Sequence, residues 1–151
     1  FIGLMLLLAG GGYRPLAKRL PETRLLGGGV VLMMVGLAAL GGVAWAVSTG
    51  AVARGPGIMA VFYAAAATAV SGFACVNPSV SALISKRADP DRQGEVLGVN
   101  QAFASLGRIV GPFVGSVLFA AHPSHTLPFV AAVVILAGVA ALLPRIARPQ
   151  A

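Results

Sequence analysis

Apolar segments alternate with short polar segments along the whole chain. A short apolar segment covers residues 1–11, and four longer ones follow over residues 25–47, 57–85, 93–121 and 127–143. A helix that crosses the hydrocarbon core of a bilayer needs about 20 apolar residues. The pattern therefore predicts an all-α protein, a polytopic membrane helix bundle that contains these four spans.

The two middle segments, 57–85 and 93–121, are long for a simple span. We expect them to tilt or to extend past the hydrocarbon core, with kinks at Pro78 and Pro112, because proline removes a helical hydrogen bond. The segment 1–11 lacks the basic residues that precede the apolar core of a signal peptide. We interpret it as the end of a partial helix, and all 151 residues as a fragment of a longer transmembrane domain.

Polar side chains are distributed unequally among the four spans. Segments 25–47 and 127–143 contain no charged residue and no Asn, Gln, Ser, Thr or His, whereas 57–85 and 93–121 contain several of these residues. A polar group in hydrocarbon needs a protein partner or a water-filled cavity. We therefore expect the outer two helices to face lipid, and the middle two to face a protein interior or a cavity.

Composition and charge place the chain in the same class. It is 58% hydrophobic and 10% charged, whereas a soluble domain is roughly half apolar and a quarter charged. Four basic residues lie in loop 12–24, three in loop 86–92 and two after residue 144, but only Arg54 lies in the alternate loops. This positive-inside pattern predicts a cytoplasmic C-terminus, and we expect the membrane to be a bacterial inner (plasma) membrane. It also accounts for the net charge of +7 without nucleic acid.

Arg108 is the one ionisable residue that the pattern places deep in a span. At 100° per residue it shares a helix face with Asn100, Ala104, Gly111 and Gly115. An arginine at a helix centre costs about 2.5–3.5 kcal/mol on insertion scales. Two interpretations stay open: a structural ion pair or a bond to backbone carbonyls, and a contact with a polar or anionic substrate or with a coupling carboxylate.

Small residues repeat beside this arginine. Gly107, Gly111 and Gly115 form a doubled small-xxx-small pattern, and Pro112 adjoins the middle glycine. Small residues at this spacing let another helix backbone approach closely. We therefore predict a kinked helix-packing motif at these four residues.

The sequence does not predict an enzyme. The four acidic residues (Glu22, Asp89, Asp91 and Glu95) lie in or next to the basic loops, and His122 and His125 lie in a loop at the opposite end of the spans. Two histidines without a third ligand do not favour a metal site. No phosphate-binding loop or nucleophile motif occurs. We expect no metal and no cofactor.

The stretch "NPSVSALISKRADPDRQGEVLGVNQAFASLGRIVGPFVGSVLF" resembles helices ten and eleven of major facilitator superfamily transporters, and most of all the drug:proton antiporter branch that includes tetracycline-efflux-like proteins. The matching residues are Pro90, Gln93, Gly94, Gly98, Ser105, Gly107, Arg108, Gly111, Pro112 and Gly115.

The loop "LAKRLPETR" at 16–24 is similar to a degenerate copy of that family's G-x-L-a-D-R-x-G-R-r loop. Lys18 stands where the first copy has Asp, and Pro21 stands where it has Gly. The resemblance therefore implies at most cytoplasmic gate contacts for Arg19 and Arg24.

The resemblance implies the C-terminal part of a twelve-helix transporter whose N-terminal half is missing from the chain. We expect proton-coupled efflux of small lipophilic or drug-like molecules by alternating access, with the proton-coupling carboxylate in the missing half. Residues of the two middle spans are expected to line the substrate cavity: Arg108, Asn100, Gln101, Asn77, Phe103 and Tyr63. The alternatives are uptake of an organic anion or sugar by the same fold, and a membrane scaffold subunit that does not transport.

Overall fold

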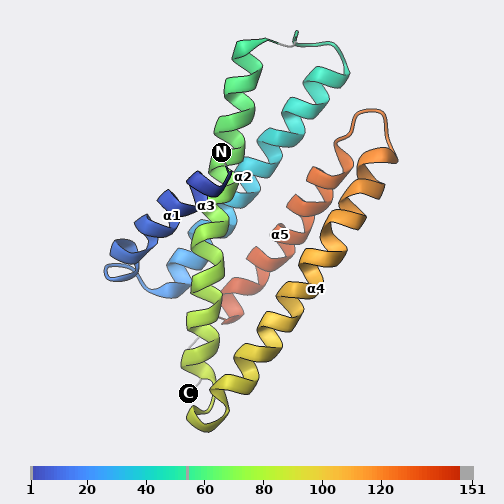
Figure 1. Ribbon diagram of the computed structural model, residues 1–151. Coiled ribbons are helices and arrows are strands. Elements are labelled where there is room, and N and C mark those ends of the chain that lie inside the picture. Colours follow the sequence, from blue (N-terminus) through green and yellow to red (C-terminus); the bar gives the residue numbers. More distant parts are fainter. Residues whose placement is uncertain (1, 54, 147–151) are drawn as a thin grey trace.

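The computed structural model describes residues 2–53 and 55–146, which form helices joined by short loops (Figure 1). The elements are α1 (Ile2–Ala17), α2 (Glu22–Ser48), α3 (Pro56–Arg87), the short 3-10 turn η1 (Pro90–Arg92), α4 (Gln93–Ala120) and α5 (Leu127–Ile146). No strand occurs within the described ranges. The predicted all-α fold is therefore confirmed.

Four helical segments of the described chain are long and apolar enough to cross a membrane: α2, α3, α4 together with η1, and α5. They run alternately up and down (Figure 1), so the loops after α2 and α4 lie at one end, and the loop between α3 and α4 lies at the other. We call this second end, with its residues Lys18, Arg19, Glu22, Arg24 and 86–95, the charged end.

Helix α1 is longer than the sequence suggested, because it continues to Ala17 through part of the predicted loop 12–24. The glycines at residues 10–12 do not end it. Tyr13 in this extension reaches α3, where its hydroxyl lies 3.3 Å from Ser79 Oγ. The contact between Tyr13 and Ser79 thus lies in the part of α1 that follows the glycines, where the local sequence does not favour a helix.

The best-packed part of the described chain lies between α2 and α3. Its buried apolar residues are Leu25, Leu26, Val30, Ala65 and Ala74. Gly29 and Gly36 of α2 face α3 so closely that a methyl group on Gly36 would lie 2.5 Å from the Ala69 amide nitrogen. The expectation that 25–47 simply faces lipid was therefore wrong for one face of this helix. That face differs from the rest of the helix in the small size of its residues and not in their polarity. Small residues let two helix backbones approach closely.

Helix α4 differs from α3, although both carry polar residues. It lies at the edge of the bundle and diverges from α3 beyond the loop that joins them (Figure 1). None of its residues is buried within the described chain. The protein interior that the sequence predicted around α4 is therefore not supplied by the other described helices.

Several hydroxyl groups in the apolar helices bond a carbonyl of their own helix. Ser81 donates to the Asn77 carbonyl at 3.2 Å, and Ser116 donates to the Pro112 carbonyl at 2.8 Å. Serine and threonine commonly bond the carbonyl four residues earlier. These hydroxyls do not by themselves require a cavity. Both helices run unbroken through Pro78 and Pro112, and the kinks predicted there stay predictions.

Candidate functional site

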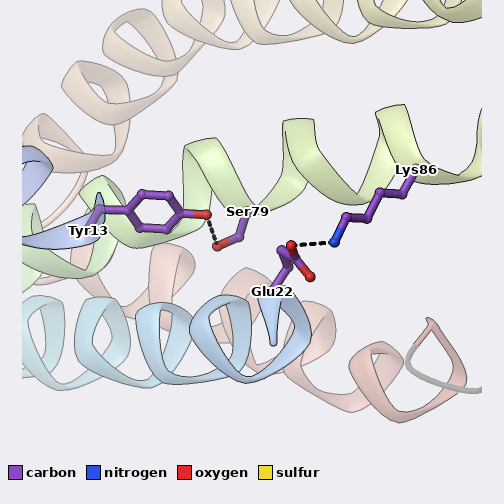
Figure 2. Close-up of polar contacts among 4 residues, drawn as sticks. All are labelled: Tyr13, Glu22, Ser79 and Lys86. Carbon is purple, nitrogen blue, oxygen red and sulfur yellow. Dashed lines mark hydrogen bonds and ion pairs between the residues drawn. The ribbon is translucent and has the colours of Figure 1, made fainter. Parts of the chain in front are cut away.

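An ion pair joins α2 and α3 at the charged end (Figure 2). Lys86 Nζ, in the last turn of α3, donates to Glu22 Oε1, in the first turn of α2, at 2.5 Å. Glu22 precedes the apolar segment that begins at Leu25 and so lies outside the membrane-spanning part. The hydrogen bond from Lys86 lowers the pKa of the Glu22 carboxyl below its ordinary value. Because the lysine is 63% exposed, the pair fixes the register of two helix ends more than it adds stability.

A second polar contact lies next to this ion pair and joins α1 to α3 (Figure 2). Ser79 is fully buried, and its hydroxyl donates to the Cys75 carbonyl at 2.7 Å. A serine hydroxyl has one proton, so Ser79 accepts the hydrogen bond from Tyr13. Sequence reasoning missed both contacts, although Glu22 and Lys86 have opposite charges and lie on the same predicted side of the membrane.

The two residues predicted for a cytoplasmic gate lie at the charged end. Arg19 follows α1, and Arg24 lies in the first turn of α2; both are exposed. Within the described part of the chain neither forms an ion pair. Their role in a gate stays a prediction.

Arg108 lies on α4, is exposed and donates from Nε to the carbonyl oxygen of Ala104 at 3.2 Å. No carboxylate in the described chain pairs with it. All four acidic residues of the sequence lie between residues 22 and 95, at the charged end. Of the two structural interpretations, the bond to a backbone carbonyl is therefore present, but it satisfies only one of the five N–H groups of the guanidinium.

The other candidate cavity residues are divided between two helices. Asn100, Gln101 and Phe103 share α4 with the arginine, whereas Asn77 and Tyr63 lie on α3. Phe103 is 70% exposed and Tyr63 is 45% exposed. Because α3 and α4 diverge (Figure 1), the described chain does not gather the six residues around a common cavity. Their role in substrate binding stays a prediction.

The glycine motif of α4 has no close neighbour among the residues that the structure describes. A methyl group added at Gly107, Gly111 or Gly115 would meet nothing within 4 Å. The motif residue Pro112 is likewise exposed. The close helix approach seen in the structure lies between α2 and α3, and the packing role of the α4 motif stays a prediction.

The two histidines stabilise the loop between α4 and α5. His122 Nδ1 accepts a hydrogen bond from the Ser124 amide at 3.1 Å. The His125 ring stacks on Phe119 with centroids 4.2 Å apart, and its Nδ1 donates to the Phe119 carbonyl at 2.8 Å. These contacts cap the end of α4. No group of three possible metal ligands occurs among the described residues.

The architecture defines a polytopic membrane protein made of apolar helices of membrane-spanning length. The sequence profile of the Major Facilitator Superfamily matches residues 2–151. The chain therefore belongs to this family, whose members are secondary transporters and not enzymes. Comparisons with curated proteins and with solved structures returned no match.

Proposed function

We propose that this chain is the C-terminal part of a transporter that exports small lipophilic or drug-like molecules in exchange for protons. The family supports transport by alternating access around a site near the membrane midplane. The antiporter-like sequence of α4 supports the efflux branch. The observation that carries the proposal is Arg108, an arginine in a membrane-spanning helix with no carboxylate partner in the described chain.

The exposed face of α4 supports a place at the substrate cavity. Arg108, Asn100 and Gln101 lie on a helix without a buried residue, and their exposure to lipid would be costly. A water-filled cavity or a further protein segment removes that cost. We propose that an N-terminal half, outside this sequence, faces α4 across the cavity.

The distribution of acidic groups supports different roles for the N-terminal and C-terminal halves of the transporter. The acids nearest the spans, Glu22 and Glu95, lie at the charged end and form ion pairs with Lys86 and Arg92. Neither lies deep in a span, where a coupling carboxylate has to exchange its proton during transport. In this proposal the N-terminal half supplies that carboxylate, and the charged end faces the cytoplasm of a bacterium.

The experiment is efflux of lipophilic drugs by the full-length protein and its Arg108→Ala variant at matched expression. We expect at least a roughly tenfold loss of efflux, because each lost 1.4 kcal/mol of binding in the transport cycle lowers affinity tenfold. Ser116→Ala is the matched control, since Ser116 bonds only its own helix. Unchanged efflux and expression in Arg108→Ala would refute the role of this arginine.

A second candidate is uptake of an organic anion, which Arg108 also favours, because it has no carboxylate partner in the described part of the chain. Growth of cells on anionic nutrients separates the two functions, since uptake supports growth and efflux raises drug resistance. A scaffold subunit is the remaining alternative. In that case Arg108→Ala disturbs folding, and the unsubstituted protein shows neither efflux nor uptake.

A further inference from the structure

Three polar side chains lie on one face of α4, in the two turns that lead to Arg108. At 100° per residue, Gln101 and Ser105 lie within about 60° of the arginine around the helix axis. All three residues are exposed in the described chain. Ser105 and Arg108 are three residues apart, so their Cβ atoms lie about 5–6 Å from each other. Gln101 lies one turn before Ser105, and the three side chains can therefore contact one bound molecule.

The side chain of Arg108 turns back along the helix toward Ser105. Its Nε lies 3.2 Å from the carbonyl oxygen of Ala104, one turn nearer the charged end. Nε carries one of the five N–H groups of a guanidinium, and the other four are on Nη1 and Nη2. Those four groups have no partner within the described chain. Two parallel N–H groups of a guanidinium can bind both oxygens of one carboxylate.

The hydroxyl of Ser105 is available for a ligand as well. Thr68, Ser81 and Ser116 each donate to the carbonyl oxygen four residues earlier in their own helix. Among the residues that the structure describes, neither the Ser105 hydroxyl nor the Gln101 amide forms a hydrogen bond. A polar group at membrane depth has to be satisfied by protein, by water or by a ligand.

Charge decides which kind of ligand fits this face. All four acidic residues of the sequence lie between residues 22 and 95, and none of the described carboxylates pairs with Arg108. The face therefore carries one full positive charge beside two neutral groups that can donate hydrogen bonds. In a medium of low dielectric constant, this charge attracts an anion and repels a cation. An oxyanion satisfies both the charge and the donors.

We infer that Arg108, Ser105 and Gln101 bind the carboxylate, or a similar oxyanion, of the exported molecule. The guanidinium holds two oxygens, and the Ser105 hydroxyl donates to one of them. Ser105 thereby adds a specificity-determining residue to the cavity that the sequence predicts. The inference rests on the proposed efflux function and narrows its substrates to lipophilic acids, as opposed to lipophilic cations.

The first test measures export by the full-length protein. The probes are two acids, nalidixic acid and fusidic acid, and two permanent cations, ethidium and tetraphenylphosphonium. We expect export of the acids and not of the cations. Ser105→Ala should raise the KM for the acids about tenfold, because a hydrogen bond to a charged group is lost. Ser105→Thr keeps the hydroxyl and the KM, and the control Ser116→Ala changes neither.

The outcomes of this test separate the inference from the proposed function. Export of the cations alone, or equal KM values for Ser105→Ala and the unsubstituted protein, would overturn the inference and leave efflux standing. Export of neither class contradicts the efflux function itself, and the inference falls with it.

A thiol test examines the same face without measuring transport. Ser105→Cys and Val110→Cys are compared in the full-length protein with Cys75→Ser. Val110 lies five residues further along α4, about 140° around the helix from Ser105. A charged methanethiosulfonate, which reacts in water and not in lipid, should modify Ser105→Cys much faster than Val110→Cys. Nalidixic acid should slow the modification of Ser105→Cys. A Ser105→Cys thiol that does not react, or that nalidixic acid does not protect, overturns the inference.

Discussion

Gly72 of α3 lies so close to Gly29 of α2 that a methyl group on Gly72 would come within 2.5 Å of the Gly29 carbonyl oxygen. The same methyl group would lie 2.7 Å from the Met33 amide nitrogen. Contacts this short with backbone atoms cannot be relieved by rotating a side chain. The separation of α2 and α3 therefore depends on the absence of a side chain at this position.

Gly72→Ala is expected to destabilise the protein by about 1–3 kcal/mol, because overpacking forces two backbones apart. The higher helix propensity of alanine offsets only part of this, up to about 1 kcal/mol. The measurement is thermal unfolding of the full-length protein in one detergent. Gly28→Ala is the control, since a methyl group there meets nothing within 4 Å. Equal unfolding temperatures for Gly72→Ala and Gly28→Ala would contradict the close packing.

The Glu22–Lys86 pair is expected to respond to charge reversal. Lys86→Glu places two carboxylates beside each other and lowers the unfolding temperature, and Glu22→Lys in the same protein restores it. Arg92→Glu with Glu95→Arg is the control, because that pair lies within a single turn and does not join two long helices. If Glu22→Lys failed to rescue Lys86→Glu, the contact between the helix ends would be refuted.

The same pair predicts a pH dependence. The pKa of the Glu22 carboxyl is lowered in the folded protein by its hydrogen bond with Lys86. Its contribution to stability is therefore full above the pKa of the unfolded carboxyl and is lost as the pH falls through the lower, folded pKa. Unfolding temperatures measured at decreasing acidic pH should fall more in the unsubstituted protein than in Glu22→Gln. Parallel curves would show that the pair contributes nothing.

The two ends of the bundle are expected to lie on opposite sides of the membrane. Single cysteines at exposed loop positions, Asp91→Cys and Pro123→Cys, test this in a Cys75→Ser background. A membrane-impermeant maleimide should label Pro123→Cys in intact cells, but Asp91→Cys only after permeabilisation. Labelling of both cysteines in intact cells, or the reverse order, would contradict the orientation inferred from the basic loops.

The helices were predictable because the length of an apolar segment is a strong signal. The pairing of α2 with α3 was not, since segment 25–47 contains no polar residue that marks an inward face. Its inward face is marked by glycines at positions 29 and 36, but four other glycines lie in the same helix. Only the packed structure distinguishes them.

The candidate site was predictable only in part. The shared face of Arg108 and Asn100 follows from helical periodicity, and α4 is continuous over both residues. The surroundings of that face depend on elements other than the described helices. Helical periodicity within α4 therefore does not predict which residues contact it. The serine hydroxyls that seemed to require a cavity, such as Ser81 and Ser116, bond their own helix instead.

The glycine contact between α2 and α3 has a consequence for the order of assembly. Its partners are consecutive in the sequence and joined by a short loop at residues 49–55, so they can associate as soon as both have left the ribosome. Helices inserted into a bilayer pair through such small-residue surfaces. We expect α2 and α3 to form a helical hairpin during synthesis, before α4 with its arginine enters the membrane. The most polar span, α4, then inserts beside a helix pair that has already formed.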